Sequence, residues 1–182
     1  VDAIVEVVRC FEDGEITHVE GKIDPIRDIE IINAELILAD LEIVENRINR
    51  IGKKAEMTKD KKELLEIGAL KKIREALLQN IPVRKVELSE EELETIKSFN
   101  LITLKPVIYV ANVSEEDIIN GGNAYYEKVC EYAREENSEV VMICAKIESE
   151  LAELDEEEKK EFLNEMGISE SGLDQLIGKT YS

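Results

Sequence analysis

Three short apolar runs, each rich in Val and Ile, most constrain how this chain can fold. They are AIVEVV (residues 3–8), VIYVA (residues 107–111) and VVMIC (residues 140–144). None alternates between apolar and polar residues, as a strand does when one face of its sheet meets water. Helical patterns follow the second and third runs, at residues 124–136 and 147–154. This order predicts an α/β fold, in which a parallel sheet is buried on both faces and helices cover both sides.

Composition narrows the class of protein. The chain has 182 residues, of which 43% are hydrophobic and 36% charged, so it has enough apolar material for a core. No apolar run approaches the ~20 residues of a membrane span, so we expect no membrane partner and a cytoplasmic location. The first residues include neither Met nor a basic leader, which predicts part of a longer chain and no signal peptide. His18 is the single histidine and is expected in a loop, and three separated cysteines predict neither structural zinc nor a disulfide framework.

A long helical segment separates the first two predicted strands. Residues 28–54 contain a heptad pattern of apolar side chains, formed by Ile37, Leu41, Val44, Ile48 and Ile51. A second helix is predicted over residues 59–80, and a third starts at the capping box Ser89–Glu92 and runs to Phe99. We therefore expect an antiparallel helical, coiled-coil hairpin inserted into the sheet domain. The predicted domains are residues 1–27 and 100–182 for the sheet and 28–99 for the insertion, which is either a structural arm or a partner-binding arm.

The charges are distributed unevenly between these segments. The net charge is −19, yet residues 47–85 contain twelve basic and five acidic residues, a net charge of +7. Candidates for contact with an anionic partner cluster near the predicted end of the hairpin: Arg47, Arg50, Lys53, Lys54, Lys59, Lys61 and Lys62. Solvated charge is the alternative. No aromatic residue interleaves this cluster, so contacts with RNA would be made to phosphates and would depend strongly on salt.

Polar residues follow the second and third predicted strands directly. Asn112 and Glu115 come after the second strand, and Cys144-Ala145-Lys146 end the third. In open α/β sheets, ligands bind beyond the carboxyl ends of the strands. The sequence therefore predicts a binding site at this edge. A helix cap formed by Ser114 to Asp117 is the simpler alternative for the first group.

The two groups resemble the base-recognition motifs of P-loop GTPases, Asn-Lys-x-Asp and Ser-Ala-Lys. Long stretches around them strongly resemble the YchF family, the Obg-like ATPases: DAIVEVVRCFEDGEITHVEGKIDPIRDIEIINAELILADLE (residues 2–42), KPVIYVANVSEED (105–117) and CAKIESELAELDEEEKKEFLNEMGISESGLDQLI (144–177). This resemblance implies part of a P-loop NTPase sheet with an inserted coiled coil. It also implies ATP with Mg²⁺ as ligand, ATP hydrolysis by the intact protein, and the ribosome or ribosomal RNA as partner.

The resemblance also assigns roles to residues. Asn112 matches the Asn that braces the nucleotide loops and faces the base, and Glu115 stands where GTPases have Asp. Val113 replaces the GTPase Lys. Ala145 matches a backbone N–H contact with the nucleotide and Lys146 the final lysine of its motif, while Cys144 replaces the usual Ser, a stronger hydrogen-bonding group.

The phosphate-binding motif is missing from this sequence. No G-x-x-x-x-G-K-[ST] occurs, and no switch segment offers a Mg²⁺-binding Asp before a Gly. The resemblance therefore implies the base-recognition half of the nucleotide domain, with the phosphate loop and the family's TGS domain outside residues 1–182 and no catalytic or metal residues within them. Two hypotheses follow: part of a ribosome-associated ATPase, or a non-catalytic helical module that binds RNA or the ribosome.

Overall fold

The computed structural model describes residues 2–12 and 23–180, so the predicted loop residue His18 lies outside the described residues. Contacts divide the chain into two compact units, Val1–Glu30 with Val107–Ser182, and Ile31–Pro106. We call the first the sheet unit and the second the arm. Among the described residues, no helix combines the length and the apolar character that a membrane crossing requires.

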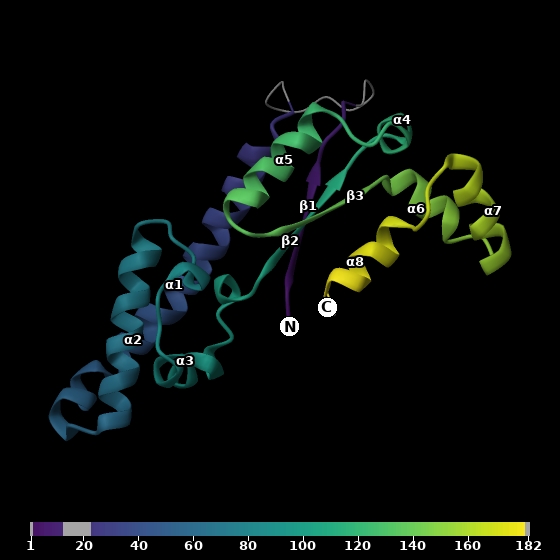
Figure 1. Ribbon diagram of the computed structural model, residues 1–182. Helices are drawn as coiled ribbons and strands as arrows, with labels where there is room; N and C mark the ends of the chain where they lie inside the picture. The colour runs from purple at the N-terminus through teal and green to yellow at the C-terminus, as the bar shows by residue number, and fades with distance from the viewer. Residues whose placement is uncertain (1, 13–22, 181–182) are drawn as a thin grey trace. The chain divides into compact units, whose positions relative to one another are not determined.

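The sheet unit contains three parallel strands in the order β1-β2-β3 (Figure 1). They are β1 (Ile4–Arg9), β2 (Val107–Asn112) and β3 (Glu139–Ile143). Arg9 pairs with Asn112, which pairs with Ile143, so the carboxyl ends of all three strands lie at one edge. The predicted α/β fold with a parallel sheet is confirmed by this pairing.

Helices cover both faces of this sheet. Val129 of helix α5 (Ala124–Glu135) packs in one core with Tyr109 of β2 and Val8 of β1. Helix α8 (Gly172–Thr180) lies against β3 on the opposite face, where a Cβ on Gly172 would overlap Cγ2 of Ile143. Only a glycine allows this close approach of helix and strand.

The prediction that all three strands are buried on both faces is wrong for β1. Five of the six residues of β2 are buried, but Val5 and Val7 of β1 are 40% and 60% exposed. β1 is an edge strand in the described part of the chain, and α8 contacts β3 and β2 on this face. The sequence pattern reports apolar character, which does not distinguish a central strand from an edge strand.

Short capped helices follow the strands. Helix α4 (Glu115–Ile119) starts at Ser114, whose hydroxyl accepts from the Asp117 N–H, and α6 (Ala145–Leu151) follows β3. Helix α7 (Glu156–Met166) starts at Asp155 in the same way, as its acidic first turn predicts. Ser171 precedes the last helix, α8, and its hydroxyl accepts from the Asp174 N–H.

The arm contains the predicted pair of helices, α1 (Pro25–Thr58) and α2 (Lys61–Leu78), which lie side by side (Figure 1). Ile37, Val44 and Ile48 of the heptad pattern share one buried core with Ile73 and other residues of α2. Lys59 lies in the turn, with a left-handed φ of 54°, and Asp60 caps α2. The predicted start of the second helix at residue 59 is therefore two residues early.

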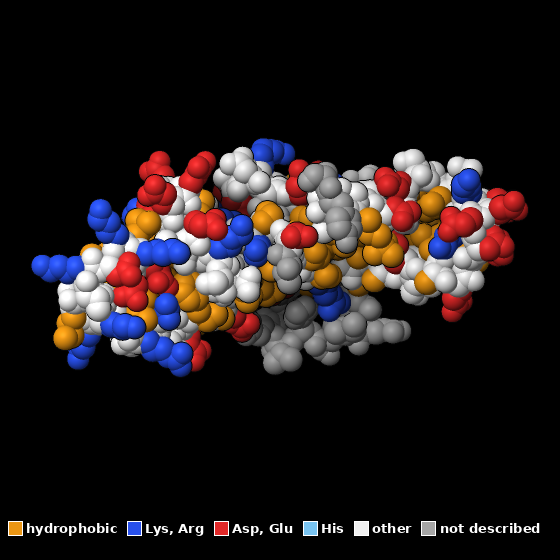
Figure 2. All heavy atoms as spheres, turned by 90° about the horizontal axis from the view of Figure 1, so that it is seen from below, with side chains coloured by type: hydrophobic (Ala, Val, Ile, Leu, Met, Phe, Trp, Pro, Cys, Tyr) orange, Lys and Arg blue, Asp and Glu red, His pale blue; other side chains and the backbone are white. Residues whose placement is uncertain are grey.

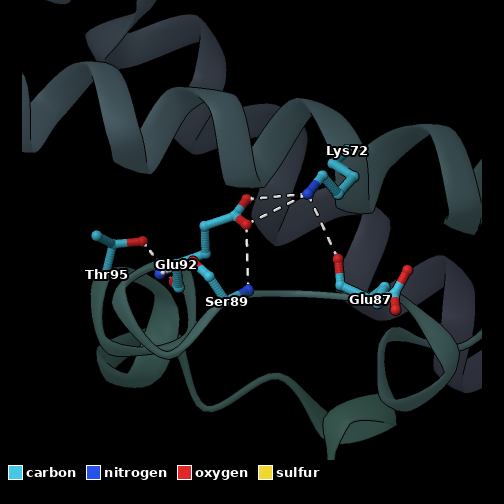
Figure 3. Close-up of polar contacts among 5 residues, drawn as sticks. All are labelled: Lys72, Glu87, Ser89, Glu92 and Thr95. Atoms are coloured by element: carbon cyan, nitrogen blue, oxygen red, sulfur yellow. Dashed lines mark hydrogen bonds and ion pairs between the residues drawn. The ribbon is translucent and has the colours of Figure 1, made fainter.

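A third helix closes the arm. Helix α3 (Glu90–Ile96) has the predicted capping box, in which Ser89 and Glu92 exchange hydrogen bonds. The Lys72 ammonium of α2 lies 3.2 Å from the Glu92 carboxylate and 3.4 Å from the Glu87 carbonyl oxygen (Figure 3). Three single-turn 3₁₀ helices complete the unit: η1 (Val83–Lys85), η2 (Lys97–Phe99) and η3 (Ile102–Leu104).

A buried carboxylate fixes the segment that leads out of the arm. Asp40 of α1 is fully buried and accepts hydrogen bonds from the N–H groups of Ile102 and Thr103, at 2.9 and 2.7 Å, and from the Thr103 hydroxyl at 2.6 Å. The same hydroxyl oxygen accepts from the Val83 N–H at 3.0 Å. This network ties η1 and η3 to α1, a few residues before β2 begins.

Candidate nucleotide-base site

The two predicted motifs meet at the carboxyl edge of the sheet. The Asn112 side-chain oxygen accepts from the Ala145 N–H at 3.0 Å. Backbone bonds continue the strand pairing beyond the sheet itself, from the Val113 N–H to the Ile143 oxygen and from the Cys10 N–H to the Asn112 oxygen, both 2.8 Å. The ends of all three strands therefore form one connected rim.

A cavity of about 400 Å³ opens at this rim. Its lining includes all six residues that the sequence analysis assigned to the base: Asn112, Val113, Glu115, Cys144, Ala145 and Lys146. Ser114, Glu116 and Phe11 complete it. Phe11 was missed, although it follows the first predicted strand and the rule that ligands bind beyond strand ends applies there too.

The charged pair at the mouth of the cavity is solvent-accessible. The Lys146 ammonium lies 3.3 Å from the Glu115 carboxylate, and their side chains are 72% and 40% exposed. Such a pair contributes at most about 1 kcal/mol to stability, so both groups are available to a ligand. The simpler alternative, in which these residues cap a helix, also applies. Ser114 caps α4, and Glu115 in the first turn of that helix lines the cavity.

The Asn112 amide has one unused donor. Its oxygen binds the Ala145 N–H, whereas no acceptor for its Nδ2 is found within the described ranges. The resemblance assigns the Ala145 N–H to a contact with the nucleotide. In this structure, that N–H donates to the Asn112 side chain. Cys144 is buried and its thiol does not cap α6.

The Phe11 wall of the cavity is held from several sides. The Asn123 side chain donates to the Cys10 oxygen at 2.6 Å, and the Tyr125 hydroxyl donates to Glu12 at 2.8 Å. The latter bond raises the pKa of Tyr125. Burial raises the pKa of the Cys10 thiol to about 12, so this cysteine stays protonated and is no nucleophile at neutral pH.

The described residues offer no metal centre. No group of three or more His, Cys, Asp or Glu side chains within residues 2–12 and 23–180 could hold a metal ion. The resemblance implies that the ligands of Mg²⁺ lie outside residues 1–182.

The basic residues of the arm separate into two kinds. Arg47 is half-buried, binds Glu66 at 3.0 Å and lies 5.7 Å from the centre of the Phe99 ring, so its charge is used within the arm. The others lie exposed around the end of the hairpin (Figure 2): Arg50, Lys53, Lys54, Lys59, Lys61 and Lys62. We call these six residues the basic tip. The acidic α7 side chains lie in the sheet unit.

The parallel sheet with its helical insertion has the fold of part of a P-loop NTPase domain. Comparison with known proteins finds close relatives along the whole of this chain. The chain is 55% identical over 183 residues to the ribosome-binding ATPase YchF of Bacillus subtilis and 49% identical over 181 residues to that of Haemophilus influenzae. Along its whole length, the chain is therefore similar to about half of a YchF protein.

These matches cover the whole of this chain and about half of each relative, 50% and 49%. The structure of the Schizosaccharomyces pombe YchF GTPase aligns with a TM-score of 0.85 and 36% identity, over 100% of this chain and 50% of that one. A scan of protein-family models found no match. The chain therefore spans about half the length of the relatives it matches.

Proposed function

We propose that this chain is the base-recognition half, with its helical arm, of an ATP-binding and ATP-hydrolysing protein that works on the ribosome in the cytoplasm. The observation that carries the proposal is the Asn112–Ala145 bridge, which joins both base motifs around one cavity. The similarity to proteins named as ribosome-binding ATPases supports it.

The cavity suits a purine base. Phe11 offers an apolar surface on which a flat ring can stack. The unused Asn112 Nδ2 donates to a ring nitrogen of the base, and the Glu115 carboxylate accepts from the exocyclic amine of adenine. The Asp of a GTPase accepts from both N1–H and the amine of guanine, and the longer Glu115 side chain does not readily occupy the same place.

Glu115→Asp in a protein of full family length tests this assignment. We expect the ratio of ATP to GTP affinity to shift toward GTP by up to about tenfold, because a lost or gained hydrogen bond to a charged group changes binding by about 1.5 kcal/mol. Glu150→Asp, an exposed acid on α6, is the matched control. An unchanged ratio, measured by titration, would assign the discrimination to the backbone.

The buried position of Val113 makes it unsuitable for substitution by Lys. Val113 stands where GTPases have Lys, but it is only 1% exposed and packs in the core of the sheet unit. A buried lysine would destabilise the strand end. Glu115→Asp alone is therefore the cleaner test.

The basic tip is proposed to contact phosphates of ribosomal RNA. Reversal of Lys53, Lys54, Lys61 and Lys62 to Glu should weaken ribosome binding and reduce its salt dependence, by about one unit of slope for each lost phosphate contact. ATP hydrolysis should remain. Lys128→Glu with Lys160→Glu, both exposed in the sheet unit, is the control. Unchanged co-sedimentation at two salt concentrations would mean that the tip is solvated surface.

A non-catalytic helical module remains the second candidate, and the full heptad core between α1 and α2 favours it. A protein of full family length that contains this sequence and binds no ATP, yet sediments with ribosomes, would establish this candidate instead.

A further inference from the structure

Arg9 occupies a special position beside the cavity. It is the last residue of β1 and pairs with Asn112, yet its side chain is not part of the cavity lining. Its guanidinium carbon lies 5.1 Å from the centre of the Phe11 ring, and its Nε donates to the Phe11 carbonyl oxygen at 3.3 Å. One side chain thus contacts both the ring and the backbone of Phe11.

An ordinary surface role does not explain this arrangement. The Nη2 of Arg9 is buried and has no acceptor in the part of the chain that the structure describes. Leaving a buried donor without an acceptor is unfavourable, and a solvated lysine or glutamine at the strand end would avoid it. The contacts that the guanidinium does make are those to Phe11, so it fixes the position of that ring.

We propose that Arg9 is a positioning residue of the base cavity: it holds the Phe11 ring as a stacking wall and so sets the affinity for purine nucleotides without contacting the base. The inference rests on the function proposed above. A guanidinium on an aromatic face is attracted by the ring quadrupole, and the bond from Nε fixes the backbone that carries the ring. A wall held in place before binding loses less entropy when the base arrives.

A double-mutant cycle in a protein of full family length tests the inference. The variants are Arg9→Gln, Phe11→Leu and the pair, with Arg134→Gln, an exposed arginine of α5, as the control. The two ligands are ATP and inorganic triphosphate, which lacks a base. We expect Arg9→Gln to weaken ATP binding roughly three- to tenfold, to leave triphosphate binding unchanged, and to have no further effect when Phe11 is already Leu.

The outcomes separate this inference from the proposed function. Equal losses for ATP and triphosphate, or independent effects of the two substitutions, would assign Arg9 to general stability and overturn the inference. So would an unchanged ATP affinity in Arg9→Gln while Phe11→Leu weakens binding. If the unmodified protein binds no ATP, the proposed function itself fails. Arg9→Lys, which keeps the charge and loses the planar group, replaces Arg9→Gln if the latter does not fold, and the same losses are expected.

Discussion

Replacement of Asp40 by Asn tests how the arm is held together. The carboxylate accepts three hydrogen bonds in a fully buried site, two of them from Thr103. An Asn oxygen can keep both bonds from Thr103, but the amide NH₂ then faces the Ile102 N–H and leaves that donor unpaired. One unpaired buried donor costs about 1–3 kcal/mol. Asp40→Ala removes the acceptor of all three donors, the two backbone N–H groups and the Thr103 hydroxyl, so it should cost more than Asp40→Asn.

The measurement is urea unfolding followed by far-ultraviolet circular dichroism, together with hydrogen exchange of the Ile102 and Thr103 amides. Exchange of these two amides should accelerate in both variants. Glu42→Gln removes an exposed acid from the same helix and should stay within about 0.5 kcal/mol of the unmodified chain. If Asp40→Asn is as stable as the unmodified chain, the network does not stabilise the arm and the reasoning is refuted.

Three further predictions concern other parts of the chain. Gly172→Ala should destabilise the docking of α8 by about 1–3 kcal/mol in urea unfolding, because the added methyl overlaps Ile143, whereas Gly178→Ala, with open space around it, should be neutral or stabilising. The hydrogen bond from the Ser89 N–H holds the pKa of Glu92 below its ordinary value of 4.5. Glu92→Gln should therefore lower the free energy of unfolding at neutral pH, and the two proteins should become equally stable as the pH falls through the lowered pKa. A difference in stability that persists in acid would contradict this. The chain of residues 1–182 alone should show no Mg²⁺-dependent ATP turnover, since it has no phosphate loop, and measurable turnover by the purified chain would overturn that.

Much of the fold could be predicted because burial leaves a pattern in the sequence. The three strands lie within one residue of their predicted ends, since each is a short run rich in Val, Ile and other apolar residues. The hairpin could be predicted because Ile37, Val44 and Ile48 repeat at heptad spacing. The exposure of Val7 could not, because it depends on which elements lie beside β1 in space.

In the candidate sites, too, some features could be predicted from the sequence and others depend on which residues lie side by side in space. Motif residues such as Asn112 could be predicted from their place after a strand, and the structure brings them to one cavity. Arg47 looked like any other tip residue until the antiparallel packing of α2 placed Glu66 beside it, nineteen residues later in the sequence. No sequence motif predicts the contact between Arg9 and Phe11, because it depends on the path of the backbone after β1.

The geometry also limits how selective the base cavity is. Stacking on Phe11 favours any flat base, and the Asn112 amide suits a ring nitrogen of either purine. In the site proposed above, Glu115 reads the edge where adenine and guanine differ, and its side chain is 40% exposed and paired with Lys146. Water competes for a carboxylate in that position, so its discrimination should stay near the lower end of the range for a charged hydrogen bond, about 1.5 kcal/mol or roughly tenfold. A cavity of this kind prefers one purine without excluding the other.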